Sequence, residues 1–371
     1  MTDNAKKKPR RVLSAFGSLD KKVRNWKYLP GIRQSCGASP RGEELVYRMN
    51  ETMLEVGQGA SAFRGYIGLA FGAGLVALLF AVVLLLHGAI SGSEGIVESV
   101  GWGFAVVIWT GLILSVPSIL WCTFMFINDF FGYVDAPLRF DRSRRKIYIW
   151  ANRKGGAQPL ELDWDEIKPV AQSASAPPYQ FNAFQSVLLV DEDENGDVRF
   201  EEKLPRIGQI GAAVLDRQHT LAAYEFVRVF MEQGPQALPP VKEHLTWRVG
   251  PRSFVDIFGL IKGTMRDWPR RPQHERRRTA GWLITGVIAM TVFAPVMLPL
   301  QLAQGIALRT TRIPVWPENY ERMAAEGGPL VPPRGSVPND SPMLLHEKLI
   351  AALWVGSALV VYALIARAWM H

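Results

Sequence analysis

The chain has 371 residues, of which 48% are apolar and 20% are charged, and its formal net charge at pH 7 is +8. Its apolar residues gather into four long runs without Asp, Glu, Lys or Arg, which excludes an ordinary soluble protein and predicts a multi-span membrane protein. A mostly polar stretch, residues 1–64, precedes the first run and argues against a secretory signal peptide.

Each of the four runs is long enough, or nearly so, to cross a hydrocarbon core of about 30 Å as a helix. They cover residues 66–86, 100–127, 282–303 and 349–366. The chain is therefore predicted to contain, in order, a basic cytoplasmic N-terminal region (1–64), a transmembrane helical hairpin (65–128), a cytoplasmic domain (129–234), a Pro- and Arg-rich linker with an interfacial helix (235–281), a third transmembrane helix (282–303), an external Pro-rich loop (304–343) and a fourth transmembrane helix with a short cytoplasmic tail (344–371).

Basic residues predict the orientation, because cytoplasmic loops carry an excess of Lys and Arg. Residues 1–64 hold 13 of them and residues 128–281 hold 23, whereas residues 88–99 hold none. We therefore expect both termini and the middle region to be cytoplasmic, and residues 88–99 and 304–343 to be external. Since topology accounts for the positive charge, we expect no nucleic-acid partner.

The segments outside the runs carry secondary-structure signals. Residues 43–56 suggest a short helix that leads into the first span. The run FDRSRRKIYIW predicts a β-hairpin, and PLELDWDEIKPV predicts a strand with Leu160, Leu162 and Trp164 on one face and polar residues on a wet face. Two further strands are expected around an Asn195-Gly196 turn, followed by one amphipathic helix that ends at Gly234.

This order of strands, with the FDRSRRKIYIW hairpin and the WDEI segment, resembles the pleckstrin-homology-like (PH-like) domains of bacterial membrane proteins. Taken whole, the chain is similar to an uncharacterised family of bacterial inner-membrane proteins often encoded beside type VI secretion effectors. The resemblance implies an α-helical membrane protein with four transmembrane helices and an inserted α+β cytoplasmic domain, whose antiparallel strands are capped by one C-terminal helix. It also implies a multi-pass protein of the bacterial inner (plasma) membrane, with an immunity or accessory role.

A calcium-like pattern lies around the predicted turn. Asp191, Asp193, Asn195, Gly196 and Glu202 match the ligand spacing of an EF-hand loop. The flanking segments do not suit one, because SVLLV before the loop favours a strand and a proline soon after it blocks a helix. We therefore expect a solvated acidic hairpin tip and no metal site.

Four basic residues form a second candidate site. Arg142, Arg144, Arg145 and Lys146 lie at the turn of the FDRSRRKIYIW hairpin, where guanidinium groups are able to contact lipid phosphates. Alternatively, these basic residues follow the second span and set the orientation of the chain in the membrane, which explains their presence equally well.

No catalytic pattern is found in the sequence. The six histidines lack metal-site spacing, and Cys36 and Cys122 are predicted to lie on different sides of a membrane boundary, so we expect no enzyme, cofactor or disulfide. By resemblance, we expect an effector protein or secretion component as a partner. The spans and the basic residues add membrane lipid, and a second copy of the chain is a further partner because four spans are able to form a pore by oligomerising. The sequence leaves two alternatives open, a lipid-sensing membrane scaffold and a channel or pore-forming toxin.

Overall fold

In a computed structural model, the chain forms two compact units. The sheet unit comprises Met1–Ala62, Asp135–Trp247 and Ile313–Asn339, and the helical unit comprises Phe63–Val134, Arg248–Arg312 and Asp340–His371. The structure describes residues 13–14, 17–18, 26–43, 45–58, 65–91, 102–133, 137–150, 152–153, 156–174, 184–201, 204–214, 217–246, 288, 291–312, 314–338 and 345–370.

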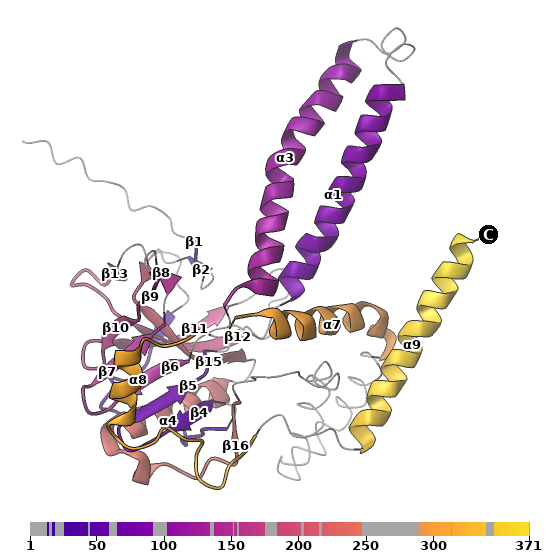
Figure 1. Ribbon diagram of the computed structural model, residues 1–371. Helices are drawn as coiled ribbons and strands as arrows, with labels where there is room; N and C mark the ends of the chain where they lie inside the picture. Colours follow the sequence, from indigo (N-terminus) through magenta and orange to yellow (C-terminus); the bar gives the residue numbers. More distant parts are fainter. Residues whose placement is uncertain are drawn as a thin grey trace, which may run out of the picture. The chain divides into compact units, whose positions relative to one another are not determined.

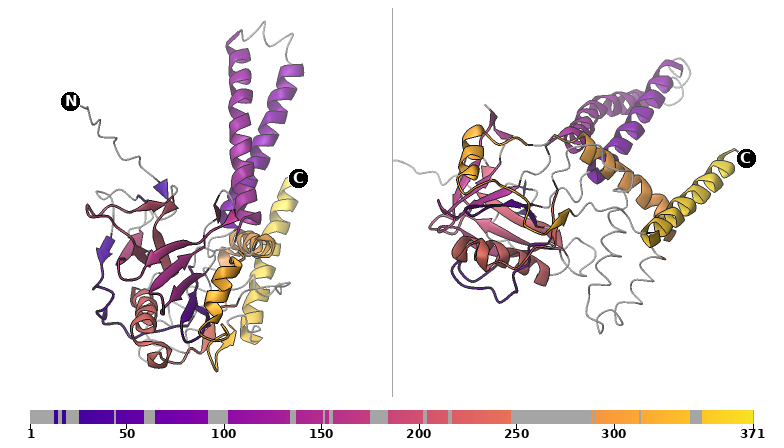
Figure 2. Two further views of the ribbon diagram at one scale, coloured as in Figure 1. Left: turned by 60° about the vertical axis from the view of Figure 1, so that its left-hand side comes forward. Right: turned by 60° about the horizontal axis from the view of Figure 1, so that its bottom comes forward.

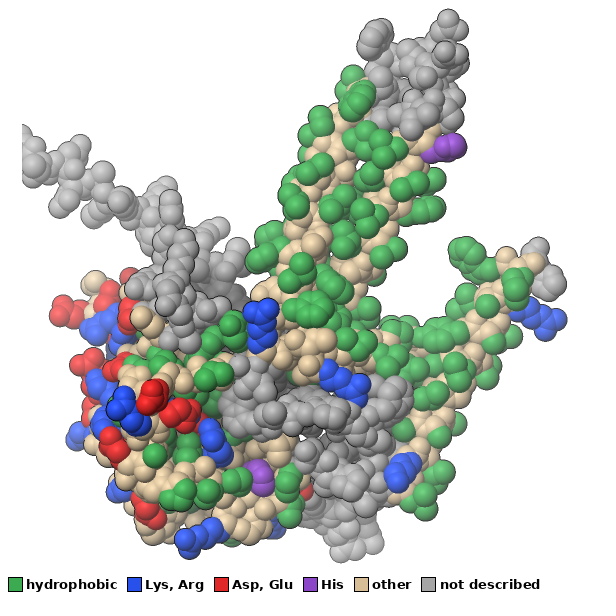
Figure 3. Space-filling view, viewed as in Figure 1, with side chains coloured by type: hydrophobic (Ala, Val, Ile, Leu, Met, Phe, Trp, Pro, Cys, Tyr) green, Lys and Arg blue, Asp and Glu red, His purple; other side chains and the backbone are tan. Residues whose placement is uncertain are grey.

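The described part of the helical unit has four helices. They are α1 (Tyr66–Ser91), α3 (Trp102–Phe131), α7 (Ala294–Thr310) and α9 (Leu345–Trp369). Three of them, α1, α3 and α9, are long and apolar enough to cross a membrane. The space-filling view shows apolar side chains along these helices (Figure 3). Of the predicted third span, 282–303, the structure describes residues 288 and 291–303, and the last ten of these form the start of α7.

Helices α1 and α3 form the predicted hairpin and lie side by side (Figures 1 and 2). Gly68 of α1 faces Phe130 of α3 so closely that a Cβ at Gly68 would lie 2.5 Å from the aromatic ring. One turn later, Gly72 faces Phe126 in the same way, with a Cβ distance of 3.0 Å. The glycine spacing therefore serves close packing within the hairpin.

A carboxylate from α3 holds the first turn of α1. Asp129 accepts hydrogen bonds from the backbone N–H groups of Gly65 (2.9 Å) and Gly68 (2.6 Å), which have no partner inside the helix. The positive end of the helix dipole favours a carboxylate at this place.

We expect Asp129→Ala to destabilise the hairpin by about 1 kcal/mol, the usual cost of losing an N-terminal cap. The measurement is the apparent Tm of the full chain in detergent. Ser118→Ala is the matched control, because the Ser118 hydroxyl is exposed and bonds only to its own helix at Leu114. Equal melting of the two variants would contradict the assigned role of Asp129.

The sheet unit is built around two antiparallel sheets and a helix (Figure 1). The five-stranded sheet has the order β10-β7-β6-β5-β4 and the four-stranded sheet the order β15-β12-β11-β3. The strands of the first are β4 (Val46–Met49), β5 (Met53–Val56), β6 (Leu138–Asp141), β7 (Lys146–Ile149) and β10 (Leu160–Asp163). Those of the second are β3 (Trp26–Tyr28), β11 (Lys168–Ala174), β12 (Phe184–Val190) and β15 (Ile207–Val214).

One apolar core joins the two sheets to helix α4 (Arg217–Gln233). Its largest buried side chains include Trp164, Phe140 of β6, and Tyr224 and Phe230 of α4, and the Phe140 and Trp164 rings meet edge to face at 6.0 Å. The predicted hairpin at residues 138–149, the strand at 184–190 and the closing helix are confirmed. The predicted Asn195-Gly196 turn is also present, with Gly196 at φ 72°.

The predicted helix at residues 43–56 is wrong, because this segment forms the β4–β5 hairpin. The Asn50 side-chain oxygen accepts hydrogen bonds from the backbone N–H groups of Thr52 (3.0 Å) and Met53 (2.7 Å) and so closes the turn. Strand β5 then pairs with β6, with Met53 opposite Asp141 and Val56 opposite Leu138. Helices α1 and α3 lie between these paired strands in the chain, so the helical hairpin is an insertion into the sheet.

Short elements complete the sheet unit. They are β1 (Leu13–Ser14), β2 (Gly17–Ser18), β8 (Asn152–Arg153), β9 (Gly156–Ala157), β13 (Phe200–Glu201), β14 (Leu204–Pro205), β16 (Glu243–His244), β17 (Val337–Pro338), the 3₁₀ helix η2 (Pro235–Ala237) and helix α8 (Glu318–Ala325).

Residues 314–338, which we call the strap, belong to the sheet unit. The strap contains α8, pairs with β4 through Met49 and Val331, and ends in a parallel pairing of β17 with β16. This packing differs from the expectation of an external loop at 304–343 set apart from the domain at 129–234. The expected interfacial helix near residues 254–261 lies outside the described residues.

Candidate functional site

The outer face of the five-stranded sheet, under the strap, is the most elaborate polar site in the described part of the chain. Leu54 and Val56 of β5 point into the core, so Met53 and Glu55 point to the opposite face. Met53 and Glu55 are as buried as the two core residues, because the strap covers the outer face.

Apolar contacts hold the strap at one part of this face. Trp316 and Ala324 of the strap are buried against Met53 of β5 and Tyr148 of β7. The Tyr148 and Tyr320 rings meet edge to face, with centroids 5.1 Å apart. Such aromatic pairs contribute about 0.5–1.5 kcal/mol beyond the area they bury.

A chain of alternating charges runs beside these contacts. Arg48 of β4 donates two hydrogen bonds to Glu55 of β5, at 2.7 and 3.0 Å. Glu55 also accepts a bond from Arg139 of β6 at 2.8 Å, and Arg139 donates to Glu321 of α8 at 2.6 Å. The side chains of Glu55 and Arg139 are both 0% exposed, so water solvates neither charge. The neighbouring protein groups must therefore offset the free-energy cost of burying the pair.

Arg139 links the sheet to the strap. Besides Glu321, it donates to the backbone carbonyl of Tyr320 at 3.2 Å, and its guanidinium lies 4.3 Å from the centroid of the Trp316 ring. A cation over a desolvated indole face gains about 2 kcal/mol. One buried cation therefore contacts a strand neighbour and three residues of the strap.

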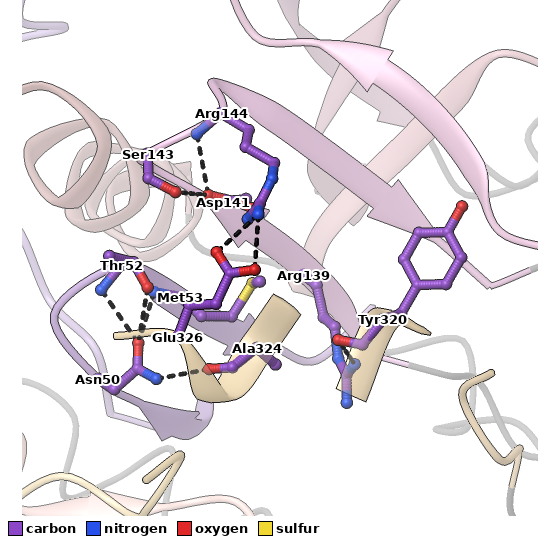
Figure 4. A network of polar contacts seen from close by, with 10 residues as sticks. All are labelled: Asn50, Thr52, Met53, Arg139, Asp141, Ser143, Arg144, Tyr320, Ala324 and Glu326. Carbon is purple, nitrogen blue, oxygen red and sulfur yellow. Dashed lines mark hydrogen bonds and ion pairs between the residues drawn. The ribbon is translucent and has the colours of Figure 1, made fainter. Parts of the chain in front are cut away.

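A second set of bonds fixes the strap at the β6–β7 turn (Figure 4). The Asp141 carboxylate accepts from the Ser143 hydroxyl (2.6 Å), the Arg144 backbone N–H (3.0 Å) and the Arg144 guanidinium (2.9 Å). Arg144 in turn donates to both oxygens of Glu326, at 2.8 and 2.6 Å. On the β4–β5 turn, the Asn50 amide donates to the carbonyls of Ala324 and Gly328, both at 2.7 Å.

Two groups at this face have a raised pKa, each for a different reason. The hydrogen bonds from Arg144 to Glu326 and Asp141 raise the pKa of its guanidinium, which stays charged. Burial, and then the nearby charges of Asp141 and Glu161, raise the pKa of the Tyr148 hydroxyl. The Tyr148 phenol therefore stays neutral at physiological pH.

The four basic residues predicted as a possible lipid contact lie where expected, on the β6–β7 turn. Arg145 pairs with Asp165 (2.6 Å) and Glu232 (2.8 Å), and Lys146 pairs with Asp163 (3.0 Å). The hydrogen bond from Arg145 lowers the pKa of Asp165. Together with the Arg144 pairs, these contacts engage three of the four charges inside the sheet unit, and Arg142 lies beside Gly234.

The calcium-like pattern is part of a hairpin tip. Asp193 accepts backbone hydrogen bonds from Asn195 and Asp197, both at 2.9 Å, which shapes the turn. Asp191 is buried and its carboxylate is bound by Arg206 and approached by Arg199 at 3.4 Å. Glu202 lies outside the described residues, and within the described residues no group of three or more His, Cys, Asp or Glu side chains is arranged to hold a metal ion.

A groove of about 430 Å³ lies between the strap, the β4–β5 turn and the segment after α4. Its residues are mostly apolar and rich in proline, with Glu51 and Arg334 as the charged side chains. The lining residues are Met49, Asn50, Glu51, Phe226, Pro235, Gln236, Leu238, Pro239, Pro240, Val241, Gly327, Pro329, Val331, Pro332, Pro333 and Arg334. Concave, mostly apolar surfaces of this kind are typical of binding sites for small ligands and extended peptide segments.

Sequence reasoning missed both the charge chain and the groove. Arg48, Glu55, Arg139 and Glu321 come from three separated chain segments, and no local pattern joins them. The one usable signal was the acidic character of residues 318–326, which contain three glutamates.

Comparison with known proteins identifies the family. Residues 118–327 match the model of a family described as a family of unknown function, DUF6708, which covers more than half of the chain. The chain belongs to this family. The matched range starts inside α3 and ends in the strap, so it includes Arg139, Arg144 and both of their glutamate partners on the strap. No curated protein and no solved structure matches the chain.

Proposed function

We propose that this protein is a membrane-anchored binding protein without catalytic activity, and that its partner is a secreted antibacterial effector for which it acts as an immunity or accessory protein. The groove at the strap carries the binding proposal. The resemblance to proteins encoded beside type VI secretion effectors supplies the class of partner and the bacterial inner membrane as the location.

The chemistry of the groove supports a protein segment as its occupant. Several prolines line it, including Pro239, Pro240 and Pro332, and proline has a fixed φ, so the lining loses little freedom on binding. Glu51 and Arg334 offer one charge of each sign at the groove. An extended peptide with apolar side chains and both charge types fits this surface.

The fold supports the same proposal. Two antiparallel sheets followed by α4 agree with a PH-like domain, in which the helical hairpin interrupts the first sheet. Strand β5 ends at Val56 and α1 begins at Tyr66, so the sheet unit is tethered to candidate membrane spans by short connections. The tether keeps the groove available to a partner that acts at the membrane.

Two valines of the strap allow a matched test. Val331 lines the groove and is 45% exposed, whereas Val337 lies outside it and is 53% exposed, and both pair with a neighbouring segment through backbone contacts. An aspartate at Val331 places a charge in the apolar groove, and an aspartate at Val337 does not.

We expect a sensitive bacterium that makes the effector encoded beside the gene to survive with the wild-type chain or Val337→Asp, and to die with Val331→Asp at equal membrane abundance. Growth and membrane potential are followed together. Depolarisation by the wild-type chain alone would replace the proposal with a pore. If the chain neither protects nor depolarises, the lipid-sensing scaffold becomes the better account.

A further inference from the structure

The strap and the rest of the sheet unit form one folded body. Glu321 of the strap bonds to the fully buried Arg139, and Asn50 bonds to two strap carbonyls. At the end of the strap, the Val337 backbone N–H donates to the Lys242 carbonyl at 2.9 Å. Segments joined in this way lie on the same side of a membrane, because side chains and backbone groups in direct contact do not reach across about 30 Å of hydrocarbon.

The two ends of the helical hairpin must also lie on the same side of the membrane. Helices α1 and α3 are both candidate spans, and they lie in the chain between β5 and β6, which pair residue by residue. Two crossings bring the chain back to the side it left. The chain between Trp247 and Ile313 connects two other parts of the sheet unit, so it must also cross an even number of times or not at all.

We infer that the chain crosses the membrane an odd number of times, with the sheet unit and strap on one side and the C-terminal end of α9 on the other. The reason is that one candidate span, α9, follows the strap. A single crossing at residues 282–303 would place the strap opposite the sheet that binds it. The predicted arrangement with four spans and both termini on one side is therefore incompatible with the packing of the strap.

The charges agree with this sidedness. Residues 88–99 contain no Lys or Arg, whereas residues 304–343 contain four Arg, which now fall on the same side as the basic sheet unit. The positive-inside rule then makes that side cytoplasmic.

Labelling of single cysteines in spheroplasts tests the inference. The background is the full chain with Cys36→Ser and Cys122→Ser, and the probe is a membrane-impermeant maleimide. Glu318→Cys reports the strap and Met370→Cys reports the end of α9, since these native side chains are 86% and 78% exposed, respectively. Glu166→Cys controls for the sheet unit, where the native side chain is 65% exposed, and Ser93→Cys controls for the segment between α1 and α3.

We expect Met370→Cys and Ser93→Cys to be labelled in intact spheroplasts, and Glu318→Cys and Glu166→Cys to be labelled only after the membrane is permeabilised. Labelling of Glu318→Cys and Met370→Cys on the same side would overturn the inference. Opposite labelling of Glu318→Cys and Glu166→Cys would also overturn it, by showing that the strap is not part of the sheet unit. A failure of the growth test leaves these outcomes unchanged, because sidedness does not depend on the partner.

Discussion

Glu55→Gln should destabilise the sheet unit by about 3–5 kcal/mol, the usual cost of removing one partner from a buried ion pair. Arg139 is fully buried beside Glu55, and its other carboxylate partner, Glu321, is about half exposed. Glutamine keeps the shape and one acceptor oxygen but removes the charge that faces both Arg139 and Arg48. No carboxylate then separates the partly exposed Arg48 from Arg139, which stays fully buried with Glu321 as its remaining carboxylate partner.

The measurement is the apparent Tm of the full chain in detergent. At about 2–4 °C per kcal/mol for a unit of this size, we expect a decrease of about 10 °C. Glu43→Gln is the control, because Glu43 is 18% exposed and pairs at 3.3 Å with Arg41, which is 48% exposed, and pairs that reach solvent contribute about 1 kcal/mol or less.

A double variant separates the loss of the pair from the cost of an orphaned charge. Arg139→Met in the Glu55→Gln background removes the buried cation, so we expect it to cost less than the sum of the two single changes. Strict additivity, or a Glu55→Gln variant that melts like Glu43→Gln, would show that the two side chains do not depend on each other.

The sequence predicted those parts of the fold whose signals are local. The β6–β7 hairpin, the Asn195-Gly196 turn and helix α4 each follow from turn residues or from apolar spacing within one short segment. The two candidate membrane helices between β5 and β6 were equally clear, because a long apolar run without charges is typical of a membrane-spanning helix.

The β4–β5 hairpin escaped prediction because its second strand, β5, is buried on both faces. Strand β5 shows no alternation of buried and exposed residues, since Met53 and Glu55 are covered by the strap while Leu54 and Val56 are in the core. Without alternation, a short apolar run does not distinguish a strand from a helix. The Asn50 side chain, which closes the turn, was the informative residue.

The candidate site was beyond sequence reasoning for a related cause. Its charges meet only after the helical hairpin is inserted between β5 and β6 and the strap folds back onto the sheet. From the sequence alone, Glu55, Arg139 and Glu321 do not differ from ordinary charged surface residues. Burial, which gives them their energetic importance, is a property of the assembled unit.

Gly327→Ala should dislodge the middle of the strap, because the position leaves no space for a side chain. An ideal Cβ at Gly327 lies 2.1 Å from the Thr52 hydroxyl oxygen and 2.9 Å from the Thr52 backbone nitrogen. The hydroxyl is able to rotate, but the Thr52 N–H is held by Asn50. We therefore expect the strap to move, at a cost of about 1–3 kcal/mol, and to lose the bonds from Asn50 and Arg144.

Trypsin provides the measurement, because Arg322 lies in α8 and becomes a better substrate when the strap leaves the sheet. Cleavage after Arg322 should be faster in Gly327→Ala than in Gly31→Ala, a control with nothing within 4 Å of its Cβ. Adding Thr52→Ala removes the closest contact and should restore part of the protection, while the contact with the Thr52 backbone remains. Equal cleavage of Gly327→Ala and Gly31→Ala would mean that the strap is not seated against the β4–β5 turn, and the argument for a groove shared by the two segments would fail with it.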